Sequence, residues 1–398
     1  MPAYPLLLDL AGRLVVVVGG GAVAQRRAHA AAAAGARVVV VAPAVADGLN
    51  DIVEVRQRTY AAGDLDGAWL VHAATDDPAV NATVAADAEE AGVWCVRADD
   101  AAATAARVPA SAVVGDVVVA VGSDGPDADP ARMATLRDAI RLLLDAGELP
   151  VRRQREHSGR VTLVGGGPGD PGLITVRGRQ ALAEADVVVV DKLAPRAWLE
   201  ALPQGVEVVD AGKAPHAHNL TQDEINALLV ERALAGQHVV RLKGGDPYVF
   251  GRGGEEALAC IAAGVPVEVV PGVTSALAVP AAAGIPVTHR GLAQEFTVVS
   301  AHLDPTHPAG TVDYDALAAS RGTLLFLMGV QRLPRIAAEL VARGRPADTP
   351  VALIEDGGLP TERVTVATLA TIGEAAAGAK PPGVIVVGDV VSLRERLT

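Results

Sequence analysis

Apolar and polar residues alternate in blocks along the first third of the chain, and the blocks predict strands and helices in turn. Runs of valine at 14–18 and 37–41 predict buried strands, and AVAQRRAHAAAA from about Ala22 predicts a helix between them. Asp77-Pro78 predicts the capped start of another helix, and DVVVAVG at 116–122 predicts the strand that closes the sheet. This alternation is typical of a parallel sheet covered on both faces.

The same alternation starts again at Arg160, after the polar segment GELPVRRQREHSG at 147–159, which we interpret as a linker. Thr221 and Glu224 predict a capping box before a long helix. We therefore predict an α/β protein: a Rossmann-like parallel sheet over residues 1–146, followed by a two-lobed α/β domain over 160–398. The lobes are expected at about 160–288 and 289–398.

Composition and charge argue against several classes of function. The chain has 398 residues and a formal charge of -13, which argues against a nucleic-acid partner. Cys95 and Cys260 lie outside any metal-binding spacing, so we expect a reducing compartment, the cytoplasm, and no metal site. Residues 269–288 carry no charge, but their prolines and glycines favour strand, loop and short helix over a membrane span.

The first glycine-rich stretch follows the first strand. Gly19-x-Gly21-x-x-Ala24 matches a dinucleotide-binding fingerprint, in which Gly19 permits the turn and Gly21 lets a pyrophosphate approach the helix N-terminus. Tight packing of helix on strand is the alternative explanation. Ala42-Pro43 stands where an acidic residue would hold the ribose, so the choice between NAD and NADP stays open.

The stretch VVGGGAVAQRRAHAAAAAGARVVVVAP, with HAATDDPAVN, resembles the dehydrogenase domain of siroheme synthases over about residues 4–145. The resemblance implies NAD-dependent oxidation of precorrin-2 to sirohydrochlorin, cofactor contacts at Ala22, Val23, Pro43 and Ala44, and a proton-accepting Asp99. The alternative role for Asp99 is a loop or cap aspartate. The family's helical subdomain is reduced here to the short linker, which leaves the dehydrogenase and iron-insertion activities open.

The second glycine-rich stretch, VTLVGGGPGDPGLIT at 161–175, has no helix directly after it. Pro168 and Pro171 donate no N–H, and Gly165, Gly166, Gly167 and Gly169 leave the backbone open to a ligand. Such a loop suits S-adenosylmethionine, because its sulfonium cation would be a poor neighbour for a positive helix end. A purely structural turn is the alternative.

The stretch RLKGGDPYVFGRGGEE at 241–256 lies at the carboxyl end of a predicted strand, where α/β sheets bind ligands. Together with GGGPGDPGLIT, VVPGVTSA and FLMG it resembles uroporphyrinogen-III C-methyltransferases of the tetrapyrrole methylase family over residues 160–398. The resemblance implies two methyl transfers that give precorrin-2, with Asp191 and Lys213 as an acid/base pair. It places S-adenosylmethionine contacts at Pro168, Gly244, Gly245, Asp246, Val249, Thr274, Ser275, Met328 and Gly357. Core packing is the alternative role for Met328.

The substrate carries many carboxylates, so a basic lining is expected near the strand ends. The candidates are Arg241, Lys243, Arg252, Arg290, Lys213, His216, His218 and His289. We expect a small-molecule tetrapyrrole partner, no nucleic acid, no membrane, and a homodimer. The alternative function is methylation of a later cobalamin-pathway precorrin, with a non-catalytic N-terminal domain.

Overall fold

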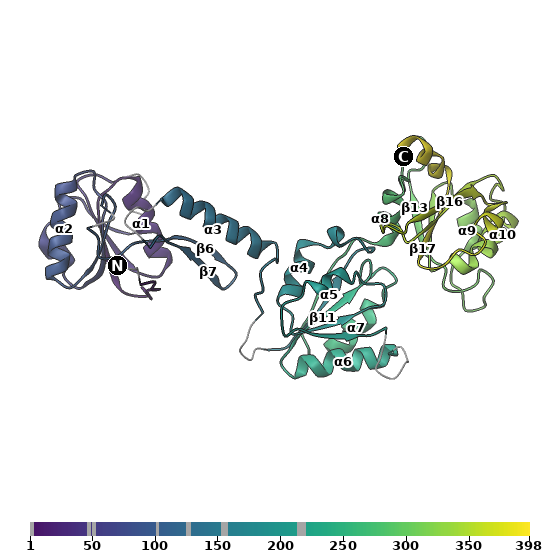
Figure 1. Ribbon diagram of the computed structural model, residues 1–398, viewed down its shortest axis with the longest axis horizontal. Coiled ribbons are helices and arrows are strands. Elements are labelled where there is room, and N and C mark those ends of the chain that lie inside the picture. The colour runs from purple at the N-terminus through teal and green to yellow at the C-terminus, as the bar shows by residue number, and fades with distance from the viewer. Residues whose placement is uncertain are drawn as a thin grey trace. The chain divides into compact units, whose positions relative to one another are not determined.

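The computed structural model describes residues 4–45, 49, 53–100, 103–124, 129–152, 158–212 and 220–398. The chain divides into two compact units, Met1–Leu142 and Leu143–Thr398 (Figure 1). In the described part of the chain, no helix is both long and apolar enough to cross a lipid bilayer.

The first unit is built on a parallel sheet with the strand order β3-β2-β1-β4-β5. Its valines are buried on both faces: Val15 and Val17 pack with alanines of α1, and Val16 and Val18 pack with α2. Successive strands are added on one side of β1 as far as β3 and on its other side from β4 onward, and open α/β sheets bind ligands at such a switch point. The elements are β1 (Leu14–Val18), α1 (Ala22–Ala33), β2 (Arg37–Val41), β3 (Glu54–Arg56), η2 (Ala62–Leu65), β4 (Ala68–Ala73), α2 (Pro78–Glu90), β5 (Trp94–Arg97) and α3 (Pro130–Asp145).

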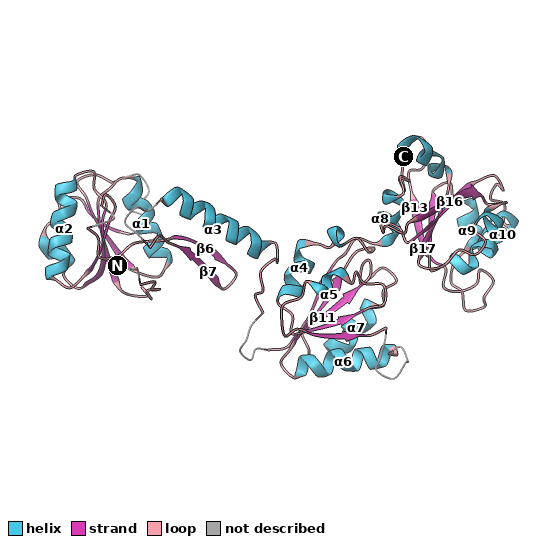
Figure 2. Ribbon diagram, in the orientation of Figure 1, coloured by secondary structure: helices cyan, strands magenta, loops and turns pink. Residues whose placement is uncertain are grey.

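The strand expected to close this sheet lies in another sheet. β7 (Val117–Val121) pairs antiparallel with β6 (Ala110–Val114) in a separate two-stranded sheet (Figure 2). Gly115 takes a φ of 58° in the short turn between them. The prediction that residues 116–122 close the parallel sheet is wrong, because a parallel neighbour needs a long crossover and this turn is too short for one.

The first lobe of the second unit contains a parallel sheet with the order β10-β9-β11-β8-β12. The capping box before α6 is confirmed, because Thr221 N donates to Glu224 Oε2 at 2.7 Å and Glu224 N donates to Thr221 Oγ1 at 3.3 Å. The elements are β8 (Arg160–Gly165), η3 (Pro171–Leu173), α4 (Val176–Ala183), β9 (Val187–Val190), α5 (Ala197–Glu200), β10 (Glu207–Asp210), α6 (Gln222–Leu234), β11 (His238–Lys243), α7 (Gly253–Ala262) and β12 (Val267–Val270).

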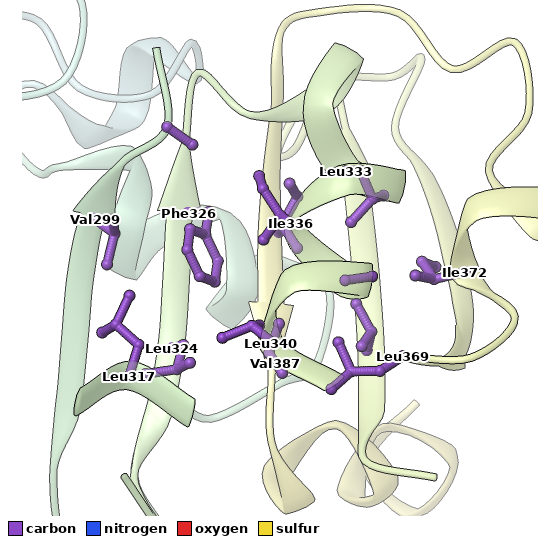
Figure 3. Close-up of a cluster of buried hydrophobic side chains, with 14 of the residues drawn as sticks. Val299, Leu317, Leu324, Phe326, Leu333, Ile336, Leu340, Leu369, Ile372 and Val387 are labelled. Atoms are coloured by element: carbon purple, nitrogen blue, oxygen red, sulfur yellow. The ribbon is translucent and has the colours of Figure 1, made fainter. Parts of the chain in front are cut away.

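The second lobe has a mixed sheet with the order β13-β14-β17-β15-β16, in which only β13 and β14 are parallel. Phe326 of β14 and Ile336 and Leu340 of α10 are fully buried on one face (Figure 3). Helix α8 packs on the other face. The elements are α8 (Ser275–Ala282), β13 (Phe296–Ser300), α9 (Tyr314–Ala319), β14 (Thr323–Leu327), η4 (Val330–Arg332), α10 (Leu333–Ala342), β15 (Pro350–Glu355), β16 (Arg363–Thr368), α11 (Ile372–Ala375), β17 (Gly383–Val387), η5 (Asp389–Leu393) and α12 (Arg394–Leu397).

Candidate active site

The second unit contains a cavity of about 830 Å³ to which both of its lobes contribute. Every residue for which the sequence predicts contact with S-adenosylmethionine lines this cavity. These residues are Pro168, Gly244, Gly245, Asp246, Val249, Thr274, Ser275, Met328 and Gly357. They come from segments almost 190 positions apart in the chain, and the fold brings them to one place.

The two glycine-rich loops meet at this cavity. Gly167 N donates to Gly245 O at 3.2 Å, and Gly245 N donates to Gly167 O at 2.7 Å. Both glycines have a left-handed backbone, with φ of 80° and 65°. The proline-containing loop delays the next α-helix to Val176, so no α-helix N-terminus directly follows the glycines.

Gly272 is a third part of this junction that the sequence reasoning did not identify. A β-carbon there would overlap the carbonyl oxygen of Gly245, and one at Gly165 would lie 2.5 Å from Gly272 N. Gly165 and Gly166 therefore serve close packing of the backbone. The expectation that both stay open to a ligand is wrong, since only Gly167 and Gly169 of that run line the cavity.

Asp246 links its own loop to Gly272 through hydrogen bonds of its carboxylate. Its Oδ2 accepts a hydrogen bond from Gly272 N at 3.0 Å, and its Oδ1 accepts one from Tyr248 N at 2.8 Å. Each carboxylate oxygen keeps a second lone pair that a ligand hydroxyl or cation could use.

Three of the residues that line the cavity are not glycine but have a positive φ: Phe250 (53°), Met328 (60°) and Asp356 (49°). Such a conformation costs about 1–3 kcal/mol and tends to occur at functional sites. Met328 is 48% exposed although it directly follows the apolar strand β14. Its exposure speaks against the core-packing alternative.

Asp191 lines the cavity beside a buried group of charges. Arg241 Nη2 donates to Asp191 Oδ1 at 3.3 Å, while Arg241 Nε donates to Glu256 Oε1 at 3.0 Å. Lys243 Nζ donates to both oxygens of Glu256, at 2.9 and 3.0 Å. Burial, and next the charge of Arg241, lowers the pKa of Lys243.

Arg241 and Lys243 were expected to offer charge to the substrate, and this expectation is wrong for both. Their side chains are only 2% and 3% exposed and do not line the cavity, because they pair with the fully buried Glu256. Arg252, Arg290 and His289 do not line it either. The cavity's described cations are Lys192, Arg196 and Arg332, which the sequence reasoning did not select.

Lys213, the expected partner of Asp191, lies outside the described residues, as do His216 and His218. The described chain reaches Gly212, just after the carboxyl end of β10, and resumes at 220.

The first unit carries the other predicted site, at the carboxyl ends of β1 and β2. Gly19 has a φ of 129°, and a β-carbon there would overlap the carbonyl oxygen of Ala74. Gly21 is the N-cap of α1. A β-carbon on Gly21 would meet nothing within 4 Å, and no side chain caps the helix. Such a helix end suits a phosphate. Ala22 and Val23 begin this helix.

Pro43 and Ala44 follow β2, and Ala44 approaches the same loop. A β-carbon at Gly20 would overlap the carbonyl oxygen of Ala44, so Gly20 is the glycine that close packing requires. The sequence reasoning assigned roles to Gly19 and Gly21 and missed this one.

Asp99 follows β5 and is held by Arg97. Arg97 Nη2 donates to Asp99 Oδ2 at 2.8 Å, and Arg97 Nε donates to Asp99 Oδ1 at 3.2 Å. The hydrogen bond from Arg97 lowers the pKa of Asp99, which keeps the carboxylate ionised at neutral pH and also makes it a weaker base. An ionised, partly exposed carboxylate can accept a proton.

Comparison with known proteins agrees with this two-part organisation. Residues 160–373 match the family of Tetrapyrrole (Corrin/Porphyrin) Methylases, and residues 6–110 match a putative NAD(P)-binding family. A uroporphyrinogen III methyltransferase of Methanosarcina barkeri that depends on S-adenosyl-L-methionine is 50% identical over 241 residues, which is 60% of this chain and 94% of that protein.

Two further relatives cover the chain differently. A siroheme synthase of Citrobacter koseri is 37% identical over 387 residues, 84% of each chain. The crystal structure of a uroporphyrin-III C-methyltransferase from Thermus thermophilus, complexed with S-adenosylhomocysteine, is 44% identical, with a TM-score of 0.51, over 59% of this chain and 100% of that one. The chain therefore belongs to the tetrapyrrole methylases and, over most of its length, to the siroheme synthase family.

Proposed function

We propose that the second unit transfers two methyl groups from S-adenosylmethionine to ring carbons of uroporphyrinogen III and so forms precorrin-2. The observation that carries this proposal is the pairing of Gly167 with Gly245 at a cavity lined by all nine predicted cofactor contacts. The relatives that cover this unit are named for the same reaction.

The cofactor supplies an electrophilic methyl group on its sulfonium. Gly167 and Gly245 line the cavity and carry no side chain, so a ligand in the cavity can approach their backbone. After a ring carbon gains the methyl group, the pyrrole ring must lose a proton. Asp191 is our candidate acceptor, because it lines the cavity and Arg241 orients its carboxylate. Lys213 is our candidate for the accompanying acid.

We propose that the first unit oxidises precorrin-2 to sirohydrochlorin with NAD. The nicotinamide cofactor supplies a hydride acceptor. The uncapped N-terminus of α1, with Gly21, Ala22 and Val23, would bind its pyrophosphate, and Pro43 and Ala44 would lie near its ribose. Asp99, ionised beside Arg97, would accept a proton from the macrocycle. Iron insertion into sirohydrochlorin stays open, and the last step of the assay below tests it.

A stepwise assay tests these assignments. Purified protein is incubated with uroporphyrinogen III and S-adenosylmethionine, then with NAD, then with Fe²⁺, and the absorption spectrum is followed. We expect precorrin-2 and then sirohydrochlorin, and the appearance of siroheme after Fe²⁺ would show that the chain also inserts iron. A spectrum that stops at precorrin-2 would refute the role of the first unit. Turnover of a later precorrin in place of uroporphyrinogen III would instead favour a cobalamin-pathway methylase.

We also propose that the protein is a homodimer. The hairpin formed by β6 and β7 exposes apolar side chains, with Val113 68% and Val118 50% exposed. No residue of α3 is buried. An exposed face of this kind is stabilised when a second copy covers it. Sedimentation analysis of the protein and of Val118→Lys tests this, with a shift to monomer expected in the variant.

We place the protein in the cytoplasm. Both Cys95 and Cys260 are free and buried in the structure, as expected for a protein that works in a reducing compartment.

A further inference from the structure

The cavity of the second unit has cationic side chains on two sides. Lys192 and Arg196 line it from the first lobe, and Arg332 lines it from the second. None of the three was expected from the sequence, because none lies in the glycine-rich stretches or in the motifs that carry the family resemblance.

On the first lobe the cations follow β9 and lie next to the end of β10. Arg196 Nη2 forms an ion pair with Asp210 Oδ2 at 2.8 Å, which holds the guanidinium in place while 48% of the side chain stays exposed. Lys192 is exposed, and a β-carbon at Gly212 would lie 3.1 Å from Lys192 Cβ. The ends of the two strands thus present both cations together.

On the second lobe Arg332 lies at the junction of η4 and α10. The left-handed turn at Met328 leads into η4, and Arg332 N donates to Gly329 O at 2.8 Å. Within the described residues the Arg332 guanidinium has no hydrogen bond or ion pair. The nearby carboxylate of Asp304 pairs instead with Arg335, at 2.6 Å.

Apolar side chains line the cavity along with these cations. Leu193, Phe250 and Met328 are 58%, 44% and 48% exposed. The carboxylates that line the cavity already accept hydrogen bonds: Asp191 from Arg241, Asp246 from backbone N–H groups, and Asp356 from Thr361 Oγ1. This combination suits a ligand with an apolar centre and anionic groups around its edge.

We propose that Lys192, Arg196 and Arg332 bind carboxylates at the edge of the macrocycle, so that one substrate molecule contacts both lobes. The proposal rests on the proposed function, and it assigns substrate affinity to three residues that the methylase motifs do not contain. Because exposed cations attract carboxylates through a screened field, their effect must weaken as salt increases.

The test measures binding directly, with uroporphyrin III, the stable oxidised form of the substrate, titrated into the full-length protein and followed by porphyrin fluorescence. Arg332→Gln and Lys192→Gln should each weaken binding about tenfold at low salt, in line with loss of a charged hydrogen bond. Arg332→Lys should recover most of the affinity. The same two substitutions should weaken the binding of coproporphyrin III by a smaller factor, because coproporphyrin III has fewer carboxylates.

Arg335→Gln is the matched control, because Arg335 is a neighbouring arginine that pairs with Asp304 and does not line the cavity. It should bind uroporphyrin III like the wild type, and all variants should bind S-adenosylhomocysteine equally. Unchanged uroporphyrin affinity in Arg332→Gln and Lys192→Gln, or an equal loss in Arg335→Gln, overturns the proposal. The wild type could bind uroporphyrin III through Arg332 and yet fail to methylate uroporphyrinogen III. That result would refute the proposed function and support carboxylate binding by the three cations.

Discussion

At the residue scale, Gly245 shows how a single position shapes the cofactor site. Both of its backbone polar groups pair with Gly167, and its φ is 65°. A β-carbon there would lie 3.7 Å from the nearest atom, so there is room for a methyl group. The backbone conformation, and not space, is what requires glycine.

Gly245→Ala should therefore lower the free energy of unfolding by about 1–2 kcal/mol, because an L-residue is strained at this φ. As the strained loop relaxes, affinity for S-adenosylhomocysteine should fall about tenfold. Urea unfolding and calorimetric titration measure the two effects. Gly264→Ala is the control: it has a φ of 72° and open space, and it follows α7. It should lose similar stability and keep its affinity. Equal affinities in the two variants would contradict the role of Gly245.

Glu256 is the second residue on which the site depends. It is fully buried and is hydrogen-bonded to both Arg241 and Lys243, so its single negative charge is shared by two almost fully buried cations, of which Arg241 also pairs with Asp191. Removing one partner from such a group leaves a buried charge unpaired, which is strongly destabilising.

Glu256→Gln should reduce the free energy of unfolding by about 3–5 kcal/mol. Its neighbour Glu255 is exposed and pairs with Arg252 at the surface, at 2.7 Å. Glu255→Gln should leave stability unchanged, since surface ion pairs contribute little. Denaturant unfolding of the two variants decides the matter. An equal loss of stability in both variants would contradict the claim that the buried charges around Glu256 stabilise the fold more than a surface ion pair does.

At the element scale, β4 buries a histidine, His72, among apolar residues. His72 is 5% exposed, and its Nδ1 has no hydrogen-bond partner within the described residues. Burial, and next the charge of Arg27, lowers its pKa to about 4. The strand therefore holds a neutral imidazole at physiological pH.

The buried His72 should make the stability of the first unit depend on pH. Because the folded-state pKa lies below the unfolded value of about 6.5, the unfolded chain binds the proton more tightly. Stability should then be highest above pH 6.5 and should fall by up to about 3 kcal/mol as pH decreases to about 4. Hydrogen exchange of β1 and β4 amides across this range measures it. His72→Leu should remove this part of the slope, and a variant with the wild-type slope would refute the assignment.

At the scale of the whole molecule, the two predicted catalytic carboxylates belong to different compact units, Asp99 to the first and Asp191 to the second. Each unit has its own sheet, core and glycine-rich loop. The two reactions should therefore be separable by single substitutions.

Asp99→Ala should leave methylation of uroporphyrinogen III intact and abolish NADH formation. Asp191→Asn should do the reverse when precorrin-2 is supplied. Each loss should be at least about a hundredfold, the usual contribution of an acid or base. Absorbance assays of both steps on both variants test this. Unchanged NADH formation by Asp99→Ala would eliminate Asp99 as the base.

The sequence by itself determined what depends on short spacing. The strands and capped helices follow from periodicity and local hydrogen bonds, as with Asp77 and Thr221, whose side chains cap the helices expected there. The glycine-rich motifs and the family resemblance identified both kinds of domain and the residues that gather at the cavity of the second unit.

Only the tertiary structure decided which distant segments meet. It paired β7 with β6 outside the parallel sheet, inserted Gly272 between the glycine loops, buried Arg241 and Lys243 around Glu256, and placed Lys192 and Arg332 at one cavity. The physical reason is that a charge or a glycine has the same local signature whether it faces solvent, core or ligand. Its surroundings come from segments far away in the chain, and no short pattern records them.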